Sequence, residues 1–150
     1  NFIDHKLMSQ KLNIQYLISY LGLIPYIFIL INKYFFFQIK EQITIDFLIY
    51  YTLIIIVFIG SINWNLNIKI KNYIIILGFL PSVFAVFIII LNLINYNYLS
   101  IIQLLILFII TQLFFEYILI YAGKENKKPF YYLRFPLTII IVSVLMIFRF

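Results

Sequence analysis

The chain has 150 residues, of which 65% are hydrophobic and 11% charged, and its formal net charge is +6. Soluble domains are about half apolar and about a quarter charged, so this composition excludes a water-soluble globular fold. Cys is absent and the single His, His5, precedes the first apolar stretch. Disulfides, thiolate metal sites and paired-His haem ligation are therefore excluded, and we expect neither a metal nor a cofactor.

Five long apolar stretches follow one another with short polar connections. A spanning helix needs about 20 apolar residues to cross about 30 Å of hydrocarbon. The stretches are continuously apolar, whereas the strands of a membrane barrel alternate apolar and polar residues. We predict an all-α, polytopic membrane protein, with a polar basic tail over residues 1–12 and a compact five-helix bundle over residues 13–150. The expected spans are residues 13–31, 43–62, 73–91, 98–121 and 135–148.

Basic residues indicate which way the spans cross the membrane. Short loops rich in Lys and Arg stay on the cytoplasmic or matrix side. Three basic residues, Lys33, Lys40 and Arg149, lie on one side of the predicted topology. Eight lie on the other, which predicts an inner N-terminus and an outer C-terminus: Lys6, Lys11, Lys69, Lys71, Lys124, Lys127, Lys128 and Arg134.

The distribution of these basic residues also indicates which partners the chain would bind. Their charges are scattered over short loops, which does not favour nucleic-acid binding. Inner-side lysines are typical contacts for anionic phospholipid headgroups, and cardiolipin would suit a matrix-facing surface. The predicted headgroup contacts are Lys69, Lys71, Lys124, Lys127 and Lys128.

The pattern L-G-x-x-P-x-x-F occurs in the first span and again 56 residues later in the third. It is either an internal duplication or a chance match in a biased composition. Gly permits close backbone approach, and Pro removes a helical hydrogen bond and bends the helix. The bends either pack helices together or open a midplane cavity for a substrate. Close packing is predicted at Gly22, Pro25, Gly60, Gly78 and Pro81.

Glu116 is the ionisable residue that lies well inside a predicted span, with Gln112 one turn earlier. Charged groups in spans are costly and usually paired or functional. Arg134 would neutralise Glu116 and fix the fourth helix to the fifth; alternatively, Glu116 is a proton or ligand site. The predicted inner-side polar cluster consists of Asn63, Trp64, Glu116, Arg134 and Thr138.

Four segments carry a family resemblance: Leu21 to Pro25 (LGLIP), Phe58 to Trp64 (FIGSINW), Gly78 to Ser82 (GFLPS) and Pro129 to Thr138 (PFYYLRFPLT). Their order and placement at helix ends resemble the transmembrane protein 69-like family, also called domain of unknown function 3429. The resemblance implies a small five-helix protein of alphaproteobacterial or mitochondrial membranes, without an established biochemical activity. Asn63 stands where the family usually has His, so any chemistry of that His is absent here.

Residue usage points to an AT-rich coding genome, since the chain has 36 Ile but 2 Ala. We therefore expect a non-enzymatic protein of the mitochondrial inner membrane, or of a bacterial inner membrane. It would be an accessory subunit or assembly element of a respiratory-chain or ATP synthase complex, with other membrane subunits as partners. The alternative is a small carrier or channel that uses Glu116 as a proton or ion site. A membrane-embedded enzyme would depend on Glu116, Arg134 and hydroxyl groups alone.

Overall fold

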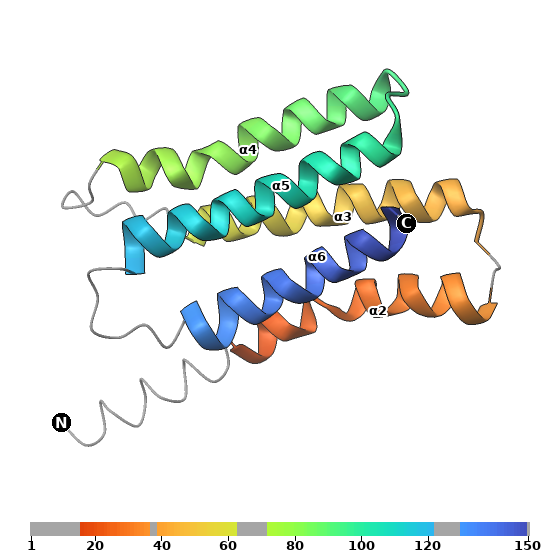
Figure 1. Cartoon of the computed structure of the whole chain (residues 1–150), viewed down its shortest axis with the longest axis horizontal. Coiled ribbons are helices and arrows are strands. Elements are labelled where there is room, and N and C mark those ends of the chain that lie inside the picture. The colour runs from red at the N-terminus through yellow and green to blue at the C-terminus, as the bar shows by residue number, and fades with distance from the viewer. Residues whose placement is uncertain (1–15, 37–38, 63–71, 122–129, 150) are drawn as a thin grey trace.

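The computed structural model describes residues 16–36, 39–62, 72–121 and 130–149 (Figure 1). Within these ranges, five helices are long and apolar enough to cross a membrane. They are Tyr16–Phe35, Glu41–Ser61, Asn72–Leu93, Tyr98–Ile120 and Phe130–Arg149. The predicted all-α, five-helix membrane fold is confirmed.

Three of the spans contain short π-helical turns next to α-helices. The first has helical residues 16–21, then α2 (Ile24–Ile31) and η1 (Asn32–Phe36). Next come α3 (Glu41–Ile62) and α4 (Asn72–Leu93). The fourth span has α5 (Tyr98–Glu116) and η2 (Tyr117–Tyr121), and the fifth has η3 (Phe130–Arg134) and α6 (Phe135–Arg149).

Successive helices run in opposite directions, so the bundle has two ends (Figure 1). The Glu116 end holds the ends of α3 and α5 and the start of α6. The Lys33 end holds the start of α3, the α4–α5 turn and the end of α6. Helix α4 packs mainly on α3, and α5 packs mainly on α6, while α2 contacts α3 and α6. The core lies between these helices, and its fully buried side chains include Leu48, Ile49, Ile101, Ile102, Leu105 and Leu145.

Helices α3 and α4 pack closely at Gly60, Gly78 and Pro81. A Cβ atom on Gly60 would lie 2.7 Å from the carbonyl oxygen of Gly78 and 2.7 Å from Cγ of Pro81. A real Cβ atom essentially never lies this close to another heavy atom. Helix α3 can therefore approach α4 this closely only with glycine at residue 60. Helix α4 continues through Pro81. The two copies of the L-G-x-x-P-x-x-F pattern make different contacts with α3, because Gly22 lies beside Tyr51 and Ile55.

Two tyrosine hydroxyls bond backbone carbonyls that lie three or four residues before a proline near the start of α2 or α6. Pro25 follows a break at Gly22, whose carbonyl accepts a hydrogen bond from Tyr51 at 2.7 Å. Pro136 cannot donate to the carbonyl of Tyr132 four residues earlier, and Tyr20 donates to that carbonyl at 2.6 Å. An unpaired carbonyl is costly in lipid, so these tyrosines stabilise the proline-containing segments.

The turn between α4 and α5 is built around Asn95, which has a positive φ of 54°. Asn95 N–H donates to the carbonyl of Asn92, and Tyr96 N–H donates to that of Leu91, both at 3.0 Å. This is a Schellman ending, in which Asn tolerates the left-handed conformation that Gly usually supplies. The Asn97 side chain then accepts from Leu99 N–H and starts α5. Together they form a tight hairpin between α4 and α5.

Candidate functional site

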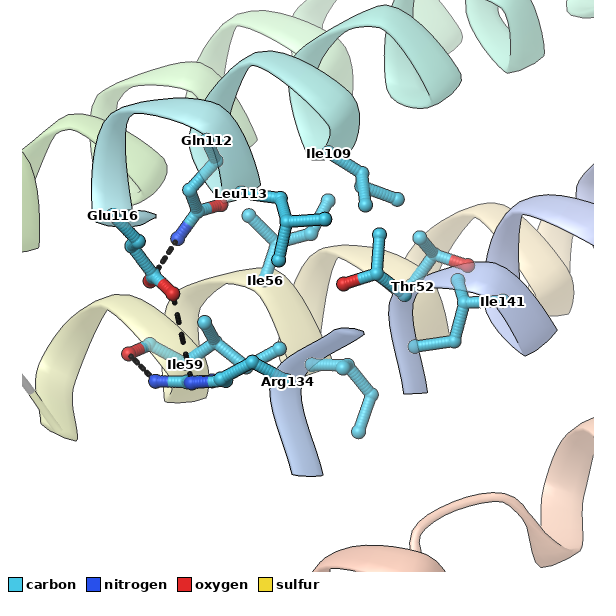
Figure 2. Close-up of a pocket in the computed structure, with 11 residues that line it drawn as sticks. Thr52, Ile56, Ile59, Ile109, Gln112, Leu113, Glu116, Arg134 and Ile141 are labelled. Carbon is cyan, nitrogen blue, oxygen red and sulfur yellow. Dashed lines mark hydrogen bonds and ion pairs between the residues drawn. The ribbon is translucent and has the colours of Figure 1, made fainter. Parts of the chain in front are cut away.

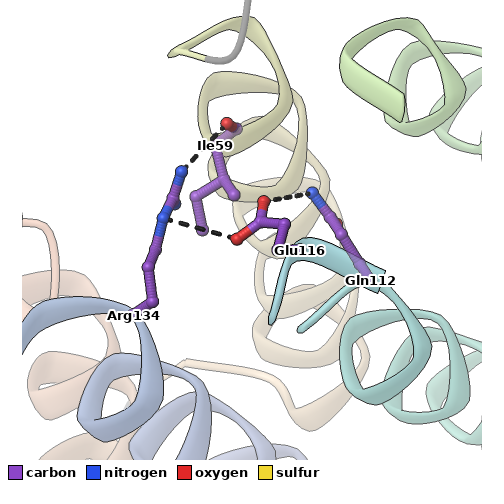
Figure 3. Close-up of polar contacts among 4 residues, drawn as sticks. All are labelled: Ile59, Gln112, Glu116 and Arg134. Carbon is purple, nitrogen blue, oxygen red and sulfur yellow. Dashed lines mark hydrogen bonds and ion pairs between the residues drawn. The ribbon is translucent and has the colours of Figure 1, made fainter. Parts of the chain in front are cut away.

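The structure brings Glu116 and Arg134 together at the Glu116 end. Glu116 is the last residue of α5 and is 2% exposed, while Arg134 precedes α6 and is 8% exposed. Arg134 Nε lies 3.6 Å from Glu116 Oε2 (Figure 3). Each group alone would be a nearly buried charge among apolar helices, which is strongly unfavourable. The pair therefore neutralises both charges and joins the fourth span to the fifth.

Two further contacts complete the charge pair (Figure 3). Gln112 Nε2 donates to Glu116 Oε1 at 3.5 Å, one turn earlier on α5. Arg134 Nη2 donates to the carbonyl oxygen of Ile59 at 3.2 Å. Ile59 lies in the last turn of α3, where carbonyls lack helical partners and a cation is favoured by the helix dipole. Arg134 therefore also caps α3, so the cluster ties three helices together.

A small cavity lies beside this cluster (Figure 2). Its volume is about 20 Å³, which is enough for about one water molecule. Thr52 and Thr138 contribute polar atoms to its lining, and the other lining groups are mostly isoleucine side chains. The Thr52 hydroxyl already bonds the Leu48 carbonyl at 2.7 Å and the Tyr26 hydroxyl at 2.9 Å. Ligand pockets are typically about 300–1,000 Å³, so this cavity is too small for an organic substrate.

The structure places some of the predicted site residues and leaves others undescribed. Thr138 lines the cavity beside the Glu116–Arg134 pair. Gly60 lies on α3 one residue after Ile59, where it packs against Gly78 and Pro81. The following predicted residues lie outside the described ranges: Asn63, Trp64, Lys69, Lys71, Lys124, Lys127 and Lys128.

Two partners in the cluster were absent from the predicted set. Gln112 carries a usable signal, since a polar residue four positions before Glu116 faces the same side of an apolar helix. The Ile59 carbonyl carries none, because every residue has the same backbone oxygen. Only the end of α3 beside Arg134 makes it a partner.

Among the residues that the structure describes, no group of three or more His, Cys, Asp or Glu side chains is arranged to hold a metal ion. The chemistry of the described cluster is that of one carboxylate, one guanidinium, an amide and two hydroxyl groups. These groups can neutralise each other's charges, cap a helix end and bind a water molecule.

Comparison with known proteins gives a family. No curated protein and no solved structure matches the chain. A family model described as "Protein of unknown function (DUF3429)" matches residues 13–149. The match covers all five helices, including the Glu116–Arg134 pair and the Gly60–Pro81 contact. The chain belongs to the DUF3429 family.

Proposed function

We propose that the chain is a non-catalytic integral protein of the mitochondrial inner membrane. In this proposal it is an accessory subunit or assembly element of a respiratory-chain or ATP synthase complex. Its partners are the membrane subunits and phospholipids around it. Its contribution is helix packing within that assembly.

The main support for the proposal is that the buried charges are paired with one another and with neighbouring groups of the protein. Glu116 and Arg134 bond to one another, to Gln112 and to the last turn of α3. The adjoining cavity of about 20 Å³ leaves room for no substrate larger than water. An acid and a base held in this way serve to fix helices, which favours a structural role over a catalytic one.

The outer helices supply a surface suited to neighbours in a membrane. Helix α4 exposes large apolar side chains along its length, among them Ile76, Phe79, Val83, Val86 and Ile90. The first span does the same with Leu17, Leu21, Ile24, Ile27 and Phe28. Such faces contact lipid or other spanning helices, whose association depends on van der Waals packing.

The proposed compartment rests on the sequence. The AT-rich residue usage is typical of organelle genomes, and the resemblance to transmembrane protein 69-like proteins points to mitochondrial or alphaproteobacterial membranes. Both arguments favour an energy-transducing membrane. A large membrane complex there would provide spanning helices for the exposed apolar faces to contact.

Isolation of the chain under gentle conditions tests this proposal. Native membranes are solubilised in a mild detergent and separated by native electrophoresis, and the chain is located by mass spectrometry. We expect it to migrate with a large respiratory or ATP synthase assembly. Migration as a lipid-dispersed monomer would contradict the proposal.

The second candidate is a carrier or channel with Glu116 as a proton site. The water-sized cavity beside Glu116, with Thr52 and Thr138 in its lining, favours this candidate. Purified protein in liposomes distinguishes the two functions, with protein-free liposomes as the control. The accessory-subunit proposal predicts no added proton or ion flux, whereas flux that Glu116→Gln abolishes would support the carrier.

A further inference from the structure

A second, much larger cavity lies at the Lys33 end of the bundle. Its volume is about 470 Å³, within the range of about 300–1,000 Å³ that is typical of ligand sites. It lies between the end of the first span, the start of α3 and the end of α6. The ends of spanning helices lie at the level of the lipid headgroups. The cavity is therefore placed where a headgroup would enter.

Two ammonium groups line this cavity, those of Lys33 and Lys40. Lys33 Nζ donates to the carbonyl of Ile147 at 2.8 Å and lies 4.4 Å from the Phe148 ring centre. These partners are a helix-end carbonyl and a ring face, so they carry only partial negative charge. An ammonium has three N–H donors, so Lys33 retains two. In the described part of the chain, neither lysine forms an ion pair with a carboxylate.

Glu41 is the acidic residue in the cavity lining, and it lies in the first turn of α3. The positive end of the helix dipole already stabilises a carboxylate in that position. Two lysines against one glutamate leave the cavity with an excess positive charge. It is suited to an anion.

The polar wall of the cavity is already formed. Asn32 and Thr44 are both 6% exposed, and the Asn32 amide donates to the Thr44 hydroxyl at 3.5 Å. The Ile39 N–H donates to Asn32 Oδ1 at 3.4 Å, and Thr44 donates to the Lys40 carbonyl at 3.3 Å. These bonds hold the start of α3 against the end of the first span. The cavity is thus built by the fold, and Lys33, which is held by the Ile147 carbonyl, and Lys40 both line it.

The remaining lining is apolar or aromatic, from Tyr34, Ile39 and Phe148. A ligand that fits both the basic and the apolar parts of the lining has a phosphate group next to a hydrocarbon chain. We propose that the cavity binds a membrane phospholipid, with its phosphodiester held by Lys33 and Lys40. Its glycerol and first acyl carbons contact Tyr34, Ile39 and Phe148. This site lies at the opposite end from the basic loops predicted to contact headgroups, and it does not depend on the proposed assembly.

Native mass spectrometry of the purified chain tests the proposal, with phosphatidylglycerol, whose headgroup is anionic, added in mild detergent. We expect one retained phospholipid per chain. Each charge-assisted hydrogen bond to phosphate that is lost weakens binding about tenfold or more, so Lys40→Gln and Lys33→Gln each lower retention by that factor. Lys33→Arg keeps the charge and retains the lipid. Arg149→Gln is the matched control, because Arg149 lies at the same end but outside the cavity lining.

Two results would overturn the proposal. One is wild-type retention by the Lys33→Gln/Lys40→Gln double variant. The other is displacement of the lipid by soluble glycerol 3-phosphate at equal concentration, which would make the ligand a soluble phosphate ester. Circular dichroism of each variant confirms the helical fold. Lys40→Gln is the safer variant for folding, since the Lys40 side chain has no hydrogen-bond partner among the described residues.

Discussion

Glu116 and Arg134 show how single residues can be charged inside an apolar bundle. Their low exposure means that bulk water contributes little to the stability of either charge. Their charges are instead offset by one another, by Gln112 and by the Ile59 carbonyl. Loss of one partner leaves the other as an unpaired buried charge, whereas loss of both leaves none. The change in unfolding free energy of the double variant should therefore differ from the sum of the changes in the two single variants.

Variants of the pair should show this order in unfolding measurements. Arg134→Leu should lower the free energy of unfolding by about 3–5 kcal/mol, since it leaves Glu116 buried and unpaired. The Glu116→Leu/Arg134→Leu double variant should recover part of that loss. Denaturant unfolding in one fixed detergent, followed by circular dichroism, gives the free energies of unfolding of the wild type, the two single variants and the double variant. Additive effects of the two single changes would mean that the residues do not interact.

Part of this site can be predicted from the sequence. A carboxylate in an apolar stretch requires a partner, and Arg134 is a basic residue close to the same helix ends. The partnership with Ile59 depends on how α3 packs beside Arg134, which side-chain types do not reveal. The Lys33 cavity was not predicted either. Its charge predicts that Lys33 lies in a loop after the first span, but the Ile147 carbonyl and the Phe148 ring let it remain on a helix.

At the scale of helices, hydropathy predicts the spans well because lipid imposes a minimum length on each. The predicted spans 43–62, 73–91 and 98–121 lie close to the observed helices. The first span continues past its expected end into η1, and the fifth begins before its expected start with η3. Both additions contain a charged residue, Lys33 or Arg134, with a partner inside the protein. Which helices pack together could not be predicted, because apolar faces of similar composition do not specify their neighbours.

Gly60 should be the position most sensitive to added volume in α3. In Gly60→Ala the new methyl group would meet the Gly78 carbonyl and Pro81, so α3 and α4 must separate. Such overpacking costs about 1–3 kcal/mol. Gly22→Ala is a matched control with a smaller expected effect, because its closest atom, the Ser19 oxygen, is 3.1 Å away. Thermal unfolding in a single detergent compares the two. Equal effects would show that the α3–α4 contact is not the tightest crossing.

The tyrosines that bond carbonyls beside proline can be tested by removing one hydroxyl. Tyr20→Phe leaves the Tyr132 carbonyl without its donor. We expect a loss of about 1 kcal/mol in the free energy of unfolding. Tyr96→Phe is the control, since Tyr96 is exposed at the α4–α5 turn and has no side-chain hydrogen bond within the described ranges. A Tyr20→Phe variant as stable as the control would show that this carbonyl finds another donor.

For the whole molecule, the distribution of basic residues predicts its orientation in the membrane. The chain has no cysteine, so single cysteines can report sidedness. Tyr96→Cys should react with a membrane-impermeant thiol reagent added to the outer face of sealed membranes. Lys127→Cys should react only after the membranes are opened, because inner-side loops retain the basic residues. The reverse labelling would show that the bundle is inserted in the opposite direction.

Glu116 has a structural role in the proposed function, in which the protein acts through its neighbours. The most direct measurement is made on Glu116→Gln in native membranes, where the folded amount of the chain and the amount recovered in its large complex are determined together. We predict that the ratio of assembled to folded chain equals that of the wild type, and that the activity of the complex follows the amount assembled. If Glu116→Gln folds and assembles at wild-type levels but the complex loses its activity, the structural role of Glu116 is contradicted.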